Sequence, residues 1–423
     1  MDIKDLINKI DNDKNLLITG PAGTGKSTII KDLKKHFGRS LILTSTTGVS
    51  ALNIGGSTIH SFSGIGIHTD LRAIKTITDN AFIWTKVQRR VRRAHIIVID
   101  EISMLRTDQL ELIDLVFKEA TGINKPFGGK VMVFVGDFLQ LPPVVSYRDT
   151  KTNLGWIFNS KVWKDANIET VHLYVIHRQS DPVFLEHLLR VRFGWCQDDT
   201  DEFFKSRTVT EKDLDSLTLR FFSTNDEAEA FNEKNLDLID EKVHLHMAEV
   251  EGQNEHYIRQ IKSSTLALES LELKIGARVM FLNNNKEKNT DEFIWVNGSL
   301  GTIIRYSAGM PVVKIDDADV EVLVEQFTWK MTNHNGEVLA EFTQLPIKLA
   351  YGVTIHKSQG LTLSKAIIDC RRVFAQGQAY VALSRVRDSK GLYLLNWNPL
   401  LIKANPEAVD FYLKSMEENL QQT

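Results

Sequence analysis

The residues best suited to do chemistry lie near the start of the chain, in the segment Gly20-Pro21-Ala22-Gly23-Thr24-Gly25-Lys26-Ser27-Thr28. Apolar residues 16–18 precede this segment and residues 28–33 follow it with helical spacing, so the pattern predicts a buried strand, a glycine-rich turn and a helix. The glycines let successive N–H groups point inward, and the helix adds the positive end of its dipole. The segment therefore predicts a phosphate-binding turn and, with it, a nucleoside triphosphate site.

Two polar side chains at the end of this turn have distinct predicted roles. Lys26 can reach the β- and γ-phosphates, and the hydroxyl of Ser27 can bind Mg²⁺. The alternative is a glycine-rich turn that only joins a strand to a helix. The residues predicted to hold the nucleotide are Gly20, Ala22, Gly23, Thr24, Gly25, Lys26, Ser27 and Thr28.

Three further apolar segments, residues 41–44, 96–99 and 131–135, predict buried strands, and helical patterns lie between them. Such alternation predicts a parallel sheet with helices on both faces, in which ligands bind beyond the carboxyl ends of the strands. Asp100 and Glu101 follow the third strand directly. We expect the aspartate to hold Mg²⁺ and the glutamate to polarise the attacking water, although alone such a pair can be surface charge.

The fourth strand leads into residues 136–144, which include Gln140 and two prolines. Because Gln140 cannot titrate, its predicted task is to hydrogen-bond the γ-phosphate or the water and so to sense hydrolysis. Pro142 and Pro143 fix an extended backbone just beyond it. The alternative is a polar turn with a proline stop.

Two segments rich in hydroxyl groups, residues 44–51 and 55–62, lie between the second and third strands and also contain His60 and Phe62. Their composition suits contacts to sugar-phosphate oxygens and stacking on a base. The alternative is a pair of solvated loops.

The composition describes an ordinary globular protein of 423 residues, long enough for about three domains. Its net charge of −3 means that a nucleic acid would have to bind a local basic groove. Cys196 and Cys370 are isolated, which argues against a disulfide framework or zinc site and favours a reducing compartment. Without a signal core or a run of eighteen apolar residues, we expect no membrane and a cytoplasmic location, nucleoid-associated in a bacterium.

Taken in order, these motifs and later ones resemble the petite-integration-frequency (PIF) type of superfamily 1 DNA helicase, in the branch that moves 5′ to 3′. The resemblance runs from about residue 15 to residue 395, and its most family-specific part is Phe127-Gly128-Gly129 before residues 136–144. The family usually carries a glutamine just upstream of the phosphate turn, whereas the first glutamine here is Gln88. The blocks that carry the resemblance are residues 20–28, 44–62, 98–104, 126–129 with 136–144, Leu173 with 177–179, 351–362 and 378–386.

The resemblance implies an α/β fold of two RecA-like, parallel-sheet P-loop NTPase domains. The first would comprise residues 1–172, with a short wedge insertion at 64–80, and the second residues 173–245 and 345–423. For the second sheet, apolar strands are predicted at 219–222, 366–368 and 392–395, with residues 379–386 on a helix. Short strands at 276–282, 301–304 and 312–315 indicate an inserted SH3-like β-barrel over residues 246–344.

The resemblance also implies ATP and Mg²⁺ as cofactors and assigns roles to single residues. Arg178 and Arg385 would come from the second domain to the triphosphate, so that the domains close with ATP and open after hydrolysis. Gly360 would touch the nucleotide, and Ser27 with Asp100 would hold the metal. The predicted catalytic residues are Lys26, Glu101, Gln140, Arg178 and Arg385. The predicted DNA-binding residues are Thr46, Thr47, Ser57, Thr58, His60, Phe62, Pro143, Thr354, His356 and Lys357.

The function implied is an ATP-dependent helicase that moves along single-stranded DNA and unwinds forked or structured DNA, such as G-quadruplexes or RNA–DNA hybrids. DNA repair, DNA replication and telomere or genome maintenance are the implied settings, and we expect a monomer in solution. One alternative is a DNA-stimulated translocase that does not unwind. Another is a regulatory NTP-binding switch without a nucleic-acid partner, whose hydrolysis rate would not respond to DNA.

Overall fold

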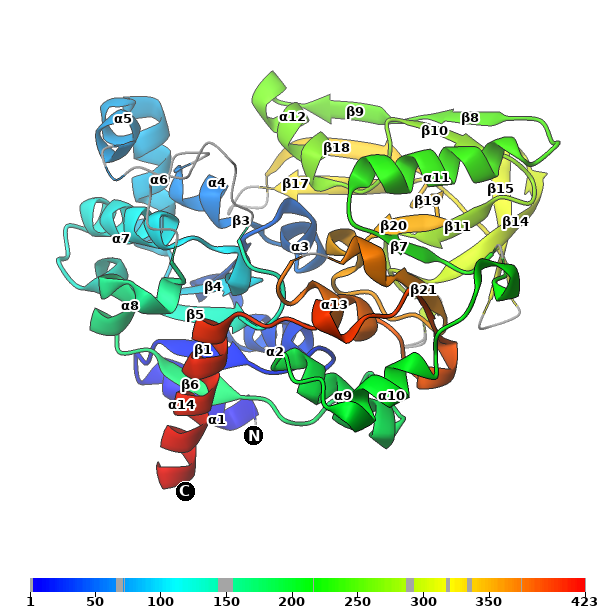
Figure 1. Ribbon diagram of the computed structural model, residues 1–423. Coiled ribbons are helices and arrows are strands. Elements are labelled where there is room, and N and C mark those ends of the chain that lie inside the picture. The colour runs from blue at the N-terminus through cyan, green and yellow to red at the C-terminus, as the bar shows by residue number, and fades with distance from the viewer. Residues whose placement is uncertain are drawn as a thin grey trace. The chain divides into compact units, whose positions relative to one another are not determined.

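The computed structural model describes residues 3–65, 71, 73–143, 155–215, 217–286, 293–316, 320–332, 337–373 and 375–422. The chain divides into two compact units (Figure 1). The first unit comprises Met1–His177 together with Asn405–Thr423, and the second comprises Arg178–Ala404. Within the described ranges, no helix is both long enough and apolar enough to cross a lipid bilayer.

The first unit is built on a six-stranded sheet with the order β3-β2-β4-β5-β1-β6, in which every pair of neighbours is parallel. The four strands predicted from apolar segments are confirmed. The other two escaped prediction because β3 has only two residues and β6 has a single apolar residue, Val171, among its four. The strands are β1 (Leu16–Thr19), β2 (Leu41–Ser45), β3 (Ser57–Thr58), β4 (Ile96–Asp100), β5 (Val131–Gly136) and β6 (Glu169–His172).

Helices pack against this sheet, and its core is formed by the aliphatic side chains of β1, β2, β4 and β5 together with those of α1 and α2. Because both faces are covered, the central strands are buried along their whole length, as expected for a parallel sheet. The helices of this unit are α1 (Ile3–Asp11), α2 (Lys26–Phe37), α3 (Gly48–Asn53), α4 (Ile59–Ser63), α5 (Ala73–Asp79), α6 (Ala81–Arg93), α7 (Thr107–Thr121), α8 (Lys161–Asp165) and α14 (Pro406–Gln422).

The second unit contains the second parallel sheet, with the order β20-β7-β21-β22. Its three predicted strands are confirmed, and the predicted helix is present but ends at Leu383, before Arg385. The strands are β7 (Arg220–Phe222), β20 (Gly352–Thr354), β21 (Ala366–Asp369) and β22 (Leu392–Leu395). The helices of this unit are α9 (Pro182–Arg192), α10 (Asp198–Lys205), α11 (Asn225–Asp237), α12 (Glu255–Ser264) and α13 (Gln378–Leu383).

The remaining strands of the second unit pair antiparallel, in sheets ordered β16-β15-β14-β11-β19, β17-β18-β9, β10-β8 and β12-β13. The three predicted short strands are confirmed as β11, β14 and β15, and Ala308 and Gly309, both with positive φ, form the turn between the last two. The likeness to an SH3 barrel stays a prediction. The strands are β8 (His244–Met247), β9 (Glu249–Gly252), β10 (Ser270–Leu273), β11 (Arg278–Phe281), β12 (Asn285–Lys286), β13 (Phe293–Trp295), β14 (Leu300–Ser307), β15 (Met310–Ile315), β16 (Glu321–Leu323), β17 (Phe327–Thr332), β18 (Val338–Gln344) and β19 (Ile347–Leu349).

The domain limits predicted from the sequence need correction at the end of the chain. Residues 405–423, predicted in the second domain, belong to the first unit because Phe411 and Tyr412 of α14 pack against Phe138. In addition, β8 begins before residue 246 and β19 lies after residue 344, so the antiparallel region extends past both predicted limits. Of the predicted wedge at 64–80, residues 66–70 and 72 lie outside the described residues, and α5 is its described helix.

Candidate active site and nucleic-acid interface

The turn after β1 has the backbone that the sequence predicts. Gly23 and Gly25 both have φ of 83°, which glycine adopts without strain. A Cβ at Gly20 would lie 2.5 Å from the carbonyl oxygen of Leu173, so only glycine fits beside the end of β6. The N–H of His177 donates to the Gly23 carbonyl over 2.9 Å. The segment after β6 therefore lines the turn, a role that the sequence did not reveal for His177.

Helix α2 begins directly at the turn, and its first residue is Lys26. The Lys26 Nζ donates to the carbonyl oxygens of Gly20 and Pro21 over 2.7 and 2.9 Å. The N-cap residue of α2 is Gly25, which has no side chain to cap the helix, so the first N–H groups of α2 point toward a position suited to an anion. Ser27 and Thr28 are exposed in this first turn, whereas Ala22 and Thr24 are buried within the loop.

Asp100 ends β4 and is 7% exposed. Its carboxylate accepts hydrogen bonds from the Ser50 hydroxyl at 3.1 Å and from the Glu101 N–H at 2.9 Å. Burial raises the pKa of Asp100, while these hydrogen bonds and the positive charge of Lys26 lower it. A buried carboxylate that burial destabilises is suited to bind a cation, because a bound metal would offset the lost hydration.

Glu101 lies at the sharp turn that follows β4. Its φ of 54° is unusual for a residue with a side chain, and such conformations concentrate at functional sites. The turn directs Glu101 off the strand axis, next to the buried Asp100. This arrangement agrees with the predicted division of work between a metal-binding aspartate and a water-polarising glutamate.

Gln140 is held in a tight turn after β5. Its side-chain Nε2 donates to the Asp137 carboxylate over 3.3 Å and its N–H donates to the Asp137 carbonyl over 3.0 Å. Asp137 also accepts the N–H of Leu139 over 3.1 Å. Asp137 therefore orients the predicted sensor, a role that no pattern in the sequence indicates. Pro143 is partly exposed at the end of the described part of this segment.

The first hydroxyl-rich segment is joined directly to the end of β4. Thr46 donates from its hydroxyl to the Glu101 carbonyl over 2.9 Å and from its N–H to the Asp100 carbonyl over 3.2 Å. Thr47 and Thr58 cap the N-termini of α3 and α4 by accepting backbone N–H groups, and Ser57 with Thr58 forms β3. The predicted DNA-contacting segment and the predicted catalytic pair thus share hydrogen bonds.

The prediction that Phe62 stacks on a base is wrong for this structure. The ring is 4% exposed, meets Phe117 edge-on at 6.0 Å and lies beneath the Arg90 guanidinium at 5.6 Å. Phe62 is a core residue that fixes α4 against α7. His60, on the same helix, is partly buried, and burial lowers its pKa while a hydrogen bond with Gln109 raises it.

In the second unit the structure brings the two predicted arginines together at the end of α13. Arg178 donates to the Thr362 hydroxyl over 3.0 Å and to the Ser384 carbonyl over 3.3 Å. Arg385 donates from Nη2 to the Ser384 hydroxyl over 2.8 Å and from Nε to the Val381 carbonyl over 2.8 Å.

Burial lowers the pKa of Arg178 to about 10, so this guanidinium stays charged at neutral pH. Gly360 has φ of 81°, and a Cβ there would meet no described atom within 4 Å. The approach of these three residues to a triphosphate stays a prediction.

The second predicted DNA-binding segment follows β20. Thr354 is 3% exposed, and its hydroxyl accepts the N–H of Lys357 over 3.3 Å. Thr354 therefore shapes the turn, and the prediction that it contacts DNA directly is wrong for this structure. Lys357 is exposed and lies 3.9 Å from a carboxylate oxygen of Glu229. His356 is partly buried, which lowers its pKa. Lys357 is therefore the residue of this segment best placed to meet a phosphate.

Comparison with known proteins agrees with this geometry. A family model described as PIF1-like helicase matches residues 2–202. The ATP-dependent DNA helicase Pif1 of Bdellovibrio bacteriovorus is 35% identical over 402 residues, which are 94% of this chain and 88% of that protein. The human ATP-dependent DNA helicase PIF1 is 33% identical over 408 residues, which are 94% of this chain and 61% of the human protein.

Solved structures show the same likeness across nearly the whole chain. Pif1 from Bacteroides sp in complex with ADP-AlF4 has a TM-score of 0.86 and 28% identity, covering 98% of this chain and 96% of that one. Pif1 from Candida albicans has a TM-score of 0.73 and 32% identity, and the match covers 97% of this chain and 98% of that one. These similarities agree with the phosphate turn and the strand-end carboxylates, and they show that the chain belongs to the PIF1-like helicases, a family of ATP-dependent DNA helicases.

Proposed function

We propose that this protein moves 5′ to 3′ along single-stranded DNA and unwinds forked or structured DNA with ATP. The observation that carries the proposal is the pair of hydrogen bonds from Thr46 to the carbonyls of Asp100 and Glu101. A strand of DNA that orders the segment of Thr46 would also order the backbone of the catalytic pair. This linkage is a physical route by which DNA can stimulate hydrolysis.

The residues present fit ATP and Mg²⁺. The phosphate turn and the uncapped start of α2 would hold the phosphates, with Lys26 exchanging the two loop carbonyls for phosphate oxygens. Ser27 and Asp100 would hold Mg²⁺, which when bound neutralises charge on the phosphates. Glu101 would orient the attacking water and accept its proton, and Gln140 would exchange its bond to Asp137 for one to the γ-phosphate or the water.

The proposed contacts to DNA come from both units and go mainly to phosphate and sugar. Thr46, Thr47, Ser57, Thr58 and His60 would contribute from the first unit, and Lys357 with His356 from the second. Such contacts are indifferent to base sequence and weaken as salt rises. Among the similar structures, a Bacteroides Pif1 is described as bound to single-stranded DNA, which supports the same kind of partner here.

Oligomeric state and location are part of the proposal. A further similar structure is described as two coordinating Pif1 helicases on forked double-stranded DNA. We infer that this protein is a monomer in solution and that any pairing occurs on DNA. A cytoplasmic location agrees with the two free cysteines, of which Cys370 is buried and Cys196 half-buried.

The deciding experiment is unwinding of one duplex that carries either a 5′ or a 3′ single-stranded tail. We expect displacement of the labelled strand from the 5′-tailed duplex, only with ATP and Mg²⁺, and ATP hydrolysis that single-stranded DNA stimulates. Displacement from the 3′-tailed duplex alone would refute the proposed direction. Stimulated hydrolysis without displacement from either duplex would favour a translocase that does not unwind.

A further inference from the structure

The hydroxyl of Tyr412 connects two parts of the nucleotide site that are far from it in the sequence. Tyr412 lies on the C-terminal helix α14, is 0% exposed, and hydrogen-bonds the Thr19 hydroxyl at 2.6 Å. The same phenol oxygen accepts the backbone N–H of Phe138 over 2.9 Å. One buried group thus bonds both the end of β1 and the turn that follows β5.

Both partners of Tyr412 stand next to predicted catalytic elements. Thr19 is the last residue of β1 and directly precedes Gly20, where the phosphate turn begins. Phe138 lies between Asp137 and Gln140, inside the turn whose hydrogen bonds hold the predicted sensor. The phenol therefore fixes the distance between the start of the phosphate turn and the turn of Gln140.

The position of the phenol is set by close aromatic packing. Phe138 meets the ring of Phe411 edge-on at 5.5 Å and that of Phe158 at 5.1 Å, and Phe411 stacks on Phe158 at 4.5 Å. Each such pair adds stability beyond the area it buries. Helix α14 cannot shift along the sheet without moving the ring of Phe138.

Helix α14, which carries Tyr412, lies directly after the connection between the two units. The backbone leaves the second unit at Ala404 and enters the first at Asn405, and α14 starts at the next residue, Pro406. Helix α14 therefore follows directly on the end of the second unit in the chain, and it contacts the turn of Gln140 through the Tyr412 hydroxyl.

We propose that Tyr412 is a positioning residue for ATP hydrolysis, which holds Gln140 in register with the phosphate turn and makes α14 part of the nucleotide site. The inference rests on the proposed ATPase function. It differs from a purely stabilising role, in which loss of the hydroxyl would weaken the fold and leave turnover per folded molecule unchanged.

A matched control lies one turn further along the same helix. Ser415 is also buried, bonds the His172 imidazole at the end of β6 over 2.7 Å and donates to the backbone carbonyl of Tyr412 over 3.3 Å. Its described hydrogen bonds reach neither the phosphate turn nor the turn of Gln140. Tyr412→Phe and Ser415→Ala each remove one buried hydroxyl from α14. We expect both variants to lower the Tm by a similar few degrees.

The test measures DNA-stimulated ATP hydrolysis of both variants at a temperature where both are folded. Tyr412→Phe should lower kcat about 5- to 10-fold and change the KM for ATP less than about twofold, because positioning of the sensor matters after the nucleotide is bound. Ser415→Ala should keep kcat within about twofold of the unmodified protein. Equal kcat values for the two variants would overturn the inference.

A second variant tests the other end of the contact. Thr19→Val removes the hydroxyl that bonds Tyr412 while keeping the shape of the side chain. If the two groups act as a unit, the double variant with Tyr412→Phe should lose no more kcat than the larger single loss. If the fold-losses in kcat of the two single variants multiply in the double variant, Thr19 and Tyr412 do not act as a unit. An unmodified protein without ATP hydrolysis would instead refute the proposed function, so the two failures are distinguishable.

Discussion

The two ends of β5 make an instructive comparison, because both carry glycines with positive φ and a buried aspartate but only one faces the nucleotide site. At the amino end, Pro126–Gly129 turns the chain into the strand. At the carboxyl end, Gly136 leads into the turn of Asp137 and Gln140. In a parallel sheet, ligands bind beyond the carboxyl ends, so the amino end has to serve the fold.

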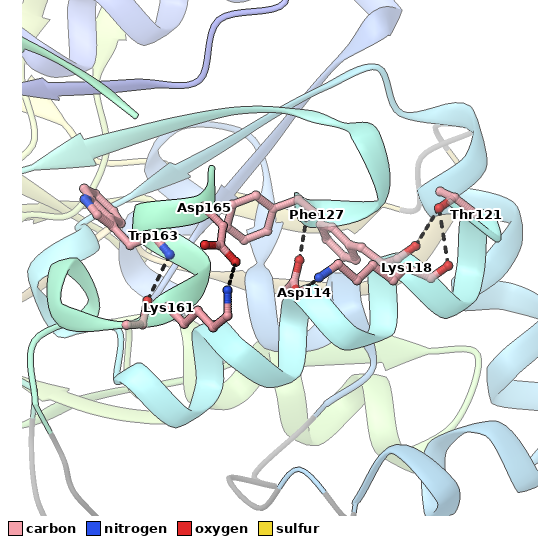
Figure 2. A network of polar contacts seen from close by, with 9 residues as sticks. Asp114, Lys118, Thr121, Phe127, Lys161, Trp163 and Asp165 are labelled. Atoms are coloured by element: carbon pink, nitrogen blue, oxygen red, sulfur yellow. Dashed lines mark hydrogen bonds and ion pairs between the residues drawn. The ribbon is translucent and has the colours of Figure 1, made fainter. Parts of the chain in front are cut away.

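Figure 2 shows how the amino end is held. The N–H of Phe127 donates to the Asp114 carboxylate over 2.6 Å, and Lys118 forms an ion pair with the other oxygen at 2.6 Å. Phe127 has φ of 53°, and a Cβ at Gly128 would lie 2.4 Å from the Phe117 carbonyl oxygen. The segment that the resemblance makes most family-specific therefore joins α7 to β5.

The difference between the amino and carboxyl edges of the sheet, taken across β5 and its neighbour β4, teaches how to weigh a buried carboxylate. Asp114 has a cation, Lys118, within its own helix. Asp100, which ends the neighbouring strand β4, accepts a hydroxyl and an N–H, and burial raises its pKa. The first arrangement is complete without a ligand, whereas the second is improved by a bound cation. Three predictions test this contrast.

The largest effect is expected for Lys26→Ala at the carboxyl side of the sheet. Loss of the ammonium should lower kcat for ATP hydrolysis by about 10²- to 10³-fold, because its charge is needed as the phosphoryl group transfers. The fold should be kept, since the described hydrogen bonds of Lys26 go to the carbonyls of Gly20 and Pro21 in the phosphate turn and not to the core of the sheet. Steady-state hydrolysis and thermal melting check this, and normal turnover would break the assignment of the site.

At the amino side, Asp114→Ala should act on stability alone. Breaking a buried pair and leaving the Phe127 N–H without its acceptor should cost about 3 kcal/mol. Asp165→Ala is the matched control, because its pair with Lys161 is exposed and should cost less than about 0.5 kcal/mol.

Figure 2 draws the two ion pairs that these variants break. Asp114→Ala and Asp165→Ala should both keep kcat per folded molecule. Urea denaturation gives the stability and active-site titration gives the folded fraction. A loss of kcat in the folded fraction of Asp114→Ala would show that the amino end takes part in catalysis.

The smallest effect concerns the stability of Asp100→Asn. Because burial raises the pKa of this carboxyl in the folded state, the folded protein holds the proton more tightly than the unfolded chain. The contribution of the Asp100 carboxyl to the free energy of unfolding therefore falls as the pH rises above the usual pKa of an aspartate. At pH 7 the ionised carboxylate destabilises the folded protein to the full extent.

The neutral amide should therefore raise the Tm of the nucleotide-free protein at pH 7 by up to about 2 °C, while hydrolysis is lost. The gain should shrink as the pH falls toward about 4. Melting curves across this range measure it, and a lower Tm at pH 7 would contradict the contrast drawn with Asp114.

The sequence by itself determined the elements whose signal is local. The phosphate turn depends on glycines and a lysine at fixed spacing, and the central strands are continuous apolar runs, so both could be predicted. The roles proposed for Asp100 and Glu101 were predicted from their place at a strand end. Short or polar strands such as β3 and β6 lack such a signal and were missed.

Only the tertiary structure decided which polar and aromatic residues are buried and which distant segments meet. Phe62 lies in a segment whose composition is typical of nucleic-acid contacts, yet its ring packs on Phe117, which is 55 positions later in the sequence. Tyr412 meets Thr19 across 393 positions. Such contacts depend on the order of strands in the sheet and on where the last helix packs, and no local pattern of residue types encodes either.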